Sequence, residues 1–392
     1  MKKKIAILGS TGSIGQNLLE IVNKNKNFFE VTMLSAEKDY ITLLRQAKKF
    51  KVKNLIIRNT KSFEILTKRT SNSSIKVYNS FADINVIFKK KIDYVMSSIT
   101  GIEGLEPTIK IIKYTKKIAI ANKESIICGW NIILKELKKN KVEFIPVDSE
   151  HFSLWFALQN LDIKSVDKIF LTASGGPFHK KPLDKFKNIQ LKEALKHPSW
   201  IMGKKISVDS STMINKVYEV IEAKNIFNIP YKNIKILIHP KSYIHAIIKF
   251  NNGLIKIIAH DTTMKIPIFN TLFFKTNKKF ESKNLDVKIL NKLSFDKIQI
   301  SRYPMIKILN FLPSRCSLFE TILVSANDTL VELFLQKKIK FIDINKQLIK
   351  FVRLKEFNKY KKITPKKVKD IINLNNYVRL KLLKKVYKFD HV

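Results

Sequence analysis

Residues 4–15 read KIAILGSTGSIG, and this stretch decides the fold of the first part of the chain. The apolar run Ile5–Leu8 is typical of a buried parallel strand, and glycines follow it at positions 9, 12 and 15. A helical pattern comes next, with apolar residues from Leu18 to Val22. In this order the backbone N–H groups at the start of a helix face one point, which suits a pyrophosphate. The spacing is related to the G-x-G-x-x-G fingerprint, so it favours nucleotide binding over a plain glycine-rich turn.

Similar units continue to about residue 150. The predicted strands are Ile5–Leu8, Val31–Ser35, Asn54–Ile57, Tyr94–Ser97, Ile118–Ala121 and Glu143–Pro146. Helical patterns lie between them, for example Tyr40–Phe50 and Leu105–Lys113. Repeated β-α units predict an α/β fold with a doubly wound parallel sheet, whose ligand site lies at the carboxyl ends of the strands.

The composition of the sequence changes after Val147. Polar clusters such as TASGGPF (172–178) and VDSSTMINK (208–216) interrupt the apolar runs as far as about Phe274. They indicate an α+β domain whose loops carry chemistry. We therefore predict a nucleotide-binding domain at 1–147, a catalytic domain at 148–274, a connector at 275–312 and a lysine-rich helical domain at 313–392.

The charge balance is strongly basic, with 74 Lys and Arg against 32 Asp and Glu and a net charge of +42. Only seven of the basic residues are arginine, the side chain that reads phosphates and guanines in a bidentate manner. The lysines are also spread along the whole chain. This pattern argues against a specific nucleic-acid partner.

Cys128 and Cys316 are the only two cysteines, too few for a disulfide framework or a structural zinc site. No apolar run approaches the roughly 18 residues needed to span a bilayer. The first predicted strand begins so close to Met1 that no room is left for a signal peptide. We expect a cytoplasmic protein with two buried, reduced thiols and no membrane association.

The choice of coenzyme depends on the residues after the second predicted strand. Glu37 and Lys38 stand side by side there, followed by Asp39. An acidic side chain at this place accepts from a free ribose 2′-hydroxyl and favours NAD, whereas a cation favours the 2′-phosphate of NADP. The residues thus indicate both NAD and NADP, and Lys38 makes NADP the favoured coenzyme.

Three carboxylates are candidates for a metal site. Asp148 and Glu150 follow the strand Glu143–Pro146, two residues apart on what we expect to be an extended segment with both side chains on one side. Glu219 follows the second polar cluster. Together they offer hard oxygen ligands for Mg²⁺ or Mn²⁺, although acidic residues at strand ends are also often solvated or cap helices. His151 is a weak zinc-ligand candidate, since no His or Cys partner has ligand spacing.

The polar clusters supply hydroxyls, an amide and one cation, which suit a phosphate monoester or, alternatively, ordinary turns and helix caps. The residues are Ser174-Gly175-Gly176-Pro177, Ser210-Ser211-Thr212 and Asn215-Lys216. The stretch HPSWIMG (197–203) adds the imidazole of His197 and the indole of Trp200. It suits either a lid over a site or a core tryptophan beside a satisfied histidine.

In this order the motifs resemble those of 1-deoxy-D-xylulose 5-phosphate reductoisomerases, nearly from end to end. The similar stretches are GSTGSIG (9–15), ANKES (121–125), PVDSEH (146–151), SGGPF (174–178), HPSW-x-MG-x-KISVDS (197–210), MINK (213–216), IHP-x-S-x-IH (238–245), RYP (302–304) and SAN (325–327). The resemblance implies a V-shaped protomer of a homodimer, with a Rossmann-like NADPH-binding domain, a catalytic and dimerisation domain and a C-terminal helical domain.

The resemblance also implies roles for individual residues. The implied metal ligands are Asp148, Glu150 and Glu219. Ser174, Ser210, Asn215 and Lys216 would hold the substrate phosphate, Lys123, Ser149 and His197 would surround the substrate backbone, and Trp200 would close over it. Lys123 and His197 join the three metal ligands as implied catalytic residues. The implied coenzyme contacts are Thr11, Gly12, Ser13, Ile14, Lys38, Asn122, Glu124 and Gly203.

The implied reaction converts 1-deoxy-D-xylulose 5-phosphate into 2-C-methyl-D-erythritol 4-phosphate, with one Mg²⁺ or Mn²⁺ per site polarising the ketone and NADPH reducing a rearranged aldehyde. The chain departs from the family where Glu37 and Asp39 replace the usual glycine and asparagine around Lys38, which adds negative charge beside the 2′-phosphate. A different NADP-dependent dehydrogenase, an inactive relative and a nucleic-acid-binding protein are the alternatives.

Overall fold

The computed structural model describes residues 1–200 and 202–387. These residues form two compact units, each discontinuous in sequence. Unit 1 contains Met1–Ser125, Ile132–Asp148 and Met264–Phe280. Of the described residues, unit 2 contains 126–131, 149–200, 202–263 and 281–387.

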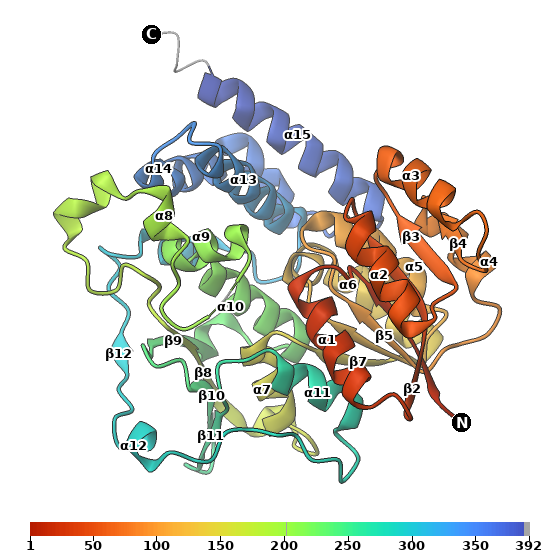
Figure 1. The fold of residues 1–392 in the computed structure, drawn as a ribbon. Helices are drawn as coiled ribbons and strands as arrows, with labels where there is room; N and C mark the ends of the chain where they lie inside the picture. Colours follow the sequence, from red (N-terminus) through yellow and green to blue (C-terminus); the bar gives the residue numbers. More distant parts are fainter. Residues whose placement is uncertain (201, 388–392) are drawn as a thin grey trace. The chain divides into compact units, whose positions relative to one another are not determined.

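Unit 1 is built on a parallel sheet with the strand order β4-β3-β2-β1-β5-β6-β7. Figure 1 labels β2, β3, β4, β5 and β7 of this sheet. The strands are β1 (Lys3–Leu8), β2 (Phe29–Ala36), β3 (Asn54–Ile57), β4 (Lys76–Tyr78), β5 (Tyr94–Ser97), β6 (Lys117–Ile120) and β7 (Glu143–Pro146). The helices are α1 (Ser13–Lys24), α2 (Tyr40–Phe50), α3 (Thr60–Thr70), α4 (Ile84–Ile87), α5 (Leu105–Ile112), α6 (Lys123–Asn140) and α11 (Lys265–Phe273). This arrangement confirms the predicted α/β fold with a doubly wound parallel sheet.

The first strand and helix take their form from the pattern of apolar residues. Ile5–Leu8 of β1 are fully buried, as expected for a strand covered on both faces. In α1 the buried residues, which include Leu18 and Val22, recur at helical spacing and pack on the sheet. The strand order reverses at β1, so the glycine turn after β1 lies at the switch point where such sheets bind ligands.

Unit 1 is completed by α11, which comes from far along the chain. This helix packs against α1, and its buried face includes Ile268 and Phe273. The Tyr94 and Thr271 hydroxyls share a hydrogen bond of 2.7 Å. The first predicted domain therefore needs a segment that we expected to belong to the second.

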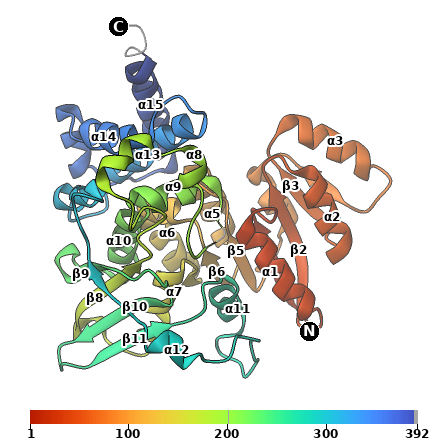
Figure 2. The same cartoon turned by 60° about the vertical axis from the view of Figure 1, so that its left-hand side comes forward.

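Unit 2 contains a mixed sheet with the strand order β11-β10-β8-β9-β12. The strands are β8 (Val166–Ala173), β9 (Ile234–Ile238), β10 (Ile244–Phe250), β11 (Ile255–Ala259) and β12 (Asp296–Lys297). Helices α7 (Ser149–Ala157) and α10 (Ile214–Phe227) both pack against this sheet, and Figure 2 shows β8, β10 and β11 side by side. The site residues of unit 2 are carried mainly by these two helices and by the turn after β8.

The remaining helices of unit 2 are α8 (Leu191–Ala194), α9 (Lys204–Thr212), α12 (Val287–Leu290), α13 (Leu318–Leu335), α14 (Phe341–Val352) and α15 (Val368–Tyr387). The buried helix α13 packs against α9, α14 and α15. The helical character predicted for the C-terminal part is thus confirmed over the described residues. None of the described helices combines the length and apolar character needed to cross a membrane.

Three predicted strands, at 54–57, 94–97 and 143–146, have the observed bounds, while the other three differ by one or two residues at one or both ends. The strand β4 was missed because it is only three residues long and lacks a buried side chain. The predicted boundary at residue 274 falls inside the segment 264–280 that packs with unit 1. The further division of residues 148–392 into three parts stays a prediction.

Candidate active site

The glycine turn of unit 1 is shaped by close backbone contacts. Gly9 has a positive φ of 81°, and a Cβ there would lie 2.9 Å from the Ser98 carbonyl oxygen. A Cβ on Gly15 would lie 2.5 Å from the Ser10 Cα, so only glycine lets α1 start this close to the strand end. Gly12 is the N-cap residue of α1 and is exposed. The predicted contacts Thr11, Gly12, Ser13 and Ile14 therefore surround a helix N-terminus, which favours an anion.

The other predicted coenzyme residues lie after neighbouring strands. Lys38 is exposed after β2. Asn122 caps α6 after β6, with its side-chain oxygen 2.6 Å from the Ser125 amide nitrogen, and Glu124 is buried in the first turn of that helix. These residues belong to unit 1, whereas Gly203 belongs to unit 2, where it is the exposed N-cap of α9.

The three predicted metal ligands form one cluster. One oxygen each of Asp148, Glu150 and Glu219 lies within 4.8 Å of the others. Our expectation of an extended segment at Asp148 and Glu150 was wrong, because the helix α7 begins at Ser149. Glu150 therefore lies in the first turn of α7, where its charge is favourable to the helix dipole.

Lys216 supplies positive charge to this cluster. Its ammonium group lies 2.7 Å from Glu150 Oε1 and also contacts Glu219 Oε2 and the Thr172 carbonyl oxygen. Burial alone would lower the pKa of Lys216, but the two carboxylates hold it above its ordinary value. Lys216 thus lies against the carboxylates in this structure, and its role at the substrate phosphate stays a prediction.

Neighbouring side chains orient the carboxylates. The Asn215 amide donates to Glu219 Oε1 at 2.6 Å, and the Ser149 hydroxyl donates to Glu150 Oε2 at 2.6 Å. Within unit 1, the Lys123 ammonium lies 2.7 Å from Asp148 Oδ2, and both side chains are largely buried. Each carboxylate therefore has a fixed orientation, as a ligand set requires.

Sequence reasoning missed Glu222, a fully buried carboxylate one helical turn after Glu219. His151 Nδ1 lies 3.4 Å from Glu222 Oε2, and His151 Nε2 donates to the Glu219 carbonyl oxygen at 2.9 Å. One atom each of Asp148, His151 and Glu222 also lies within 4.8 Å of the others. The i, i+3 spacing of the two glutamates on α10 was the available signal.

The serines predicted to bind phosphate are brought together by another glycine. A Cβ on Gly176, whose φ is 66°, would lie 3.1 Å from the Ser210 carbonyl oxygen of α9. The Ser174 turn and α9 are therefore in close contact. Both Ser174 and Ser210 are half-buried, while Ser211 is buried and donates to the Val208 carbonyl oxygen instead.

His197 has a fixed tautomer. Its Nδ1 accepts from the backbone amides of Ser199 and Trp200 at 3.2 and 3.0 Å, so Nε2 carries the proton and donates to Ser174 Oγ at 3.0 Å. The Gly176 amide donates to the same oxygen, which leaves the Ser174 hydroxyl hydrogen available for an acceptor such as phosphate. Burial, and to a lesser extent Lys216, lowers the pKa of His197 to about 4, so the ring is neutral near pH 7.

Trp200 packs edge-on against a histidine pair that sequence reasoning missed. The Trp200 and His245 ring centroids are 6.1 Å apart, and the His245 and His260 rings are stacked at 3.7 Å. Burial, and then His260, lowers the pKa of His245 to about 3. The pKa of His260 is lowered by burial as well, so both rings are neutral near pH 7 and form the stacked pair against which Trp200 packs.

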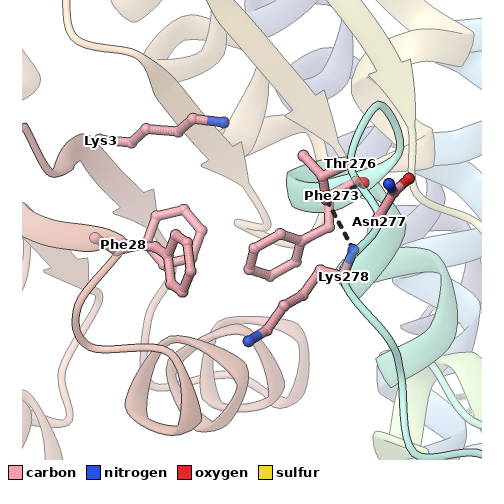
Figure 3. Close-up of a pocket in the computed structure, with 7 residues that line it drawn as sticks. Lys3, Phe28, Phe273, Thr276, Asn277 and Lys278 are labelled. Atoms are coloured by element: carbon pink, nitrogen blue, oxygen red, sulfur yellow. Dashed lines mark hydrogen bonds between the residues drawn. The ribbon is translucent and has the colours of Figure 1, made fainter.

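Figure 3 shows a cavity of about 260 Å³ in unit 1. Its lining residues lie at the amino ends of β1 and β2, whereas the glycine turn follows the carboxyl end of β1. The cavity is also lined by the end of α11, and its lining includes Lys3, Phe28, Phe273 and Lys278. Because the candidate coenzyme contacts follow the carboxyl ends of the strands, this cavity is separate from them.

A glycine turn at the switch point of a doubly wound sheet and a carboxylate cluster that could hold a metal ion are the features that a metal-dependent α/β oxidoreductase requires. Family models for 1-deoxy-D-xylulose 5-phosphate reductoisomerase match residues 5–129 and, for its C-terminal domain, 144–227. A third model, for the DXP reductoisomerase C-terminal domain, matches residues 261–381. The 1-deoxy-D-xylulose 5-phosphate reductoisomerase of Pelagibacter ubique (strain HTCC1062) is 57% identical over 97% of this chain and 98% of its own length.

Comparison with solved structures points to the same family. The reductoisomerase from Zymomonas mobilis in complex with NADPH shares 28% identity with a TM-score of 0.87, over 98% of this chain and 99% of that one. A DOX-P reductoisomerase in complex with NADPH, fosmidomycin and magnesium shares 27% identity with a TM-score of 0.85, over 99% of both chains. The chain belongs to the 1-deoxy-D-xylulose 5-phosphate reductoisomerase family, as its motifs indicated.

Proposed function

We propose that this protein catalyses the NADPH-dependent and divalent-metal-dependent conversion of 1-deoxy-D-xylulose 5-phosphate into 2-C-methyl-D-erythritol 4-phosphate. The observation that carries the proposal is the cluster of Asp148, Glu150 and Glu219, whose oxygens lie within 4.8 Å of one another. The family membership and the relatives solved with NADPH and magnesium support the same reaction.

The donor set fits Mg²⁺ or Mn²⁺, because three carboxylates offer hard oxygen ligands and leave coordination positions for substrate oxygens. Asp148, Glu150 and Glu219 would hold the cation, which polarises the substrate carbonyl when bound. Lys216 contacts one oxygen of Glu150 and one of Glu219, so its ammonium offsets the charge of two of the carboxylates that would hold the cation. Lys123 then keeps Asp148 oriented through their ion pair.

The remaining polar groups of unit 2 position the substrate. We assign the phosphate to Ser174, Ser210, Asn215 and Lys216, with Ser149, His197 and Trp200 around the carbon chain. The neutral His197 orients the Ser174 hydroxyl as a donor to a phosphate oxygen. Trp200, packed against His245, would exclude water from the reacting carbons. Binding the phosphate away from the reacting carbons supplies energy for this positioning.

We assign the coenzyme to Thr11, Gly12, Ser13, Ile14, Lys38, Asn122, Glu124 and Gly203. The amides at the start of α1 would bind the pyrophosphate, and NADPH supplies the hydride when bound.

One assay tests the function. NADPH consumption is followed by absorbance with the pentulose phosphate in the presence of Mg²⁺, of Mn²⁺ or of a chelator, and the series is repeated with NADH. We expect substrate-dependent oxidation of NADPH only when a divalent cation is present. Oxidation that persists in chelator would favour a metal-independent dehydrogenase, and no oxidation under any condition would indicate an inactive relative.

We also propose that the protein forms a homodimer through the edge strand β11. Leu254, Ile255 and Ile257 are 67%, 60% and 52% exposed on and beside this strand. Covering an exposed apolar sheet edge with a second copy of the same chain is energetically favourable. Sedimentation of the wild type and of Ile257→Lys tests this: a dimer that dissociates in the variant is expected, and a monomeric wild type refutes it.

The cytoplasm is the proposed location, since Cys128 and Cys316 are both free thiols. Recovery of the activity in the cytoplasmic fraction of the source cells is the expected result.

A further inference from the structure

The segments that follow β2 and β3 are tied together by hydrogen bonds that extend the pairing of the two strands. Ala36 lies opposite Ile57 at the end of the ladder. Beyond it, the Arg58 amide donates to the Ala36 carbonyl oxygen at 3.3 Å, and the Asn59 amide donates to the Glu37 carbonyl oxygen at 2.8 Å. The Ser62 hydroxyl donates to the Lys38 carbonyl oxygen at 2.8 Å. Arg58 is therefore held beside Glu37 and Lys38 by the backbone.

Four charged residues directly follow the carboxyl ends of the neighbouring strands β2 and β3. Glu37, Lys38, Asp39 and Arg58 are all exposed. Asp39 caps α2, since its Oδ1 accepts from the Thr42 amide at 3.0 Å, and the helix dipole offsets its charge. Glu37 and Lys38 cancel each other locally. Arg58 is the cation that makes this edge favourable to an anion.

We propose that Arg58 is a coenzyme-specificity residue, which binds the 2′-phosphate of NADPH together with Lys38 and offsets the repulsion from Glu37. This inference rests on the proposed function, which places NADPH on unit 1. The ribose 2′-position in a doubly wound fold is read just after the second strand, where a nearby arginine accommodates the 2′-phosphate. A guanidinium group offers parallel N–H donors that match phosphate oxygens, which an ammonium group cannot reproduce.

The assignment explains how the chain tolerates a glutamate next to Lys38. With Glu37 alone beside Lys38, the edge would discriminate poorly between a free 2′-hydroxyl and a 2′-phosphate. The neighbouring strand supplies the missing positive charge, and the backbone bonds of Arg58 and Asn59 keep that charge in place.

The test is a binding experiment that does not require turnover. Dissociation constants of NADPH and NADH are measured from coenzyme fluorescence at fixed ionic strength, without sugar phosphate, for the wild type, Arg58→Ala and Arg58→Lys. We expect Arg58→Ala to weaken NADPH binding about tenfold while NADH binding changes less than about twofold. The dissociation constant of NADPH for Arg58→Lys should lie between those of the wild type and Arg58→Ala, because lysine keeps the positive charge but lacks the parallel N–H donors of the guanidinium group.

Lys53→Ala is the matched control. Lys53 is exposed just before β3, so this variant loses the same unit charge at the opposite end of the same strand. Both coenzymes should bind the Lys53→Ala variant as they bind the wild type. If Lys53→Ala weakens NADPH binding as much as Arg58→Ala does, Arg58 acts only through net charge and the assignment is overturned.

The remaining outcomes separate this inference from the proposed function. A wild type that prefers NADPH, with Arg58→Ala unchanged or weakened equally toward both coenzymes, would overturn the role of Arg58 and leave the function intact. A wild type that does not prefer NADPH would contradict the NADPH dependence and the role of Arg58 together.

Discussion

The candidate sites of the two units consist of different chemical groups: backbone amides in unit 1 and charged side chains in unit 2. In unit 1 the coenzyme turn consists mainly of backbone amides and glycines that follow one strand, within residues 9–15. In unit 2 the carboxylates Glu150 and Glu219 are largely buried charges on α7 and α10, about 70 residues apart, and each has a partner that holds it. A backbone site depends on the absence of side chains, while a side-chain site depends on every charge remaining compensated. The two should therefore fail in different ways when mutated.

The largest effect is expected at the carboxylate cluster. Glu219→Gln keeps the size of the side chain but removes a charge from the metal ligands, so kcat should fall on the order of 10³-fold. The measurement is metal-dependent NADPH oxidation across a range of Mg²⁺ concentrations. Glu332→Gln, which changes a glutamate that is 52% exposed, is the control and should retain activity. A kcat of Glu219→Gln within tenfold of the wild type would contradict the ligand role.

Removing the compensating cation should affect folding. Lys216→Met leaves Glu150 and Glu219 without their shared ammonium, so the free energy of unfolding should decrease by about 3 kcal/mol in chelator. Added Mg²⁺ should restore part of the loss if the carboxylates bind it. Urea unfolding with chelator and with Mg²⁺ measures both effects, and equal stability of variant and wild type in chelator would show that the charges are not coupled.

The glycine turn should be sensitive to the space at each position rather than to charge. A Cβ on Gly15 would lie 2.5 Å from the Ser10 Cα, so Gly15→Ala should lower stability by about 2 kcal/mol and weaken NADPH binding. A Cβ on Gly12 would meet only the Gly9 carbonyl oxygen at 3.5 Å, so Gly12→Ala should change stability by less than about 0.5 kcal/mol. Thermal unfolding without coenzyme compares the two variants. A Gly12→Ala variant as unstable as Gly15→Ala would refute the steric explanation.

The smallest effect concerns pH and the histidines of unit 2. Burial holds the pKa of His245 at about 3 and that of His197 at about 4, below the ordinary value of 6.5. The unfolded chain therefore binds more protons below pH 6.5, and the stability from the neutral rings, complete above that pH, is lost progressively as the pH falls toward 3 or 4. Between pH 6 and 5, His245→Phe should lose about 1 kcal/mol less than the wild type in urea unfolding. Equal losses would show that His245 titrates normally.

How much the sequence predicts differs between the units for the same reason. The turn at Gly9–Gly15 is contiguous, so its strand, turn and helix are visible together, and the parallel sheet follows from repetition of that unit. The carboxylates were identified as a set, yet their surroundings were not: nothing local indicates that Lys216 contacts Glu150 or that Glu222 lies against His151, because these pairs join different helices. The stacked pair His245 and His260 depends on the antiparallel pairing of β10 with β11. Such contacts depend on tertiary packing, which periodicity does not encode.

The helix α11 has a consequence for how the chain is made. Its apolar face, with Ile268 and Phe273, covers the core of unit 1, but Met264 leaves the ribosome roughly 115 residues after Asp148, where the strands of that unit are complete. At the usual pace of translation this is an interval of about ten seconds. During that time the nascent sheet lacks its final cover, and the apolar surface around α1 is available to chaperones. A fragment that ends at residue 148 would carry the same exposed surface permanently.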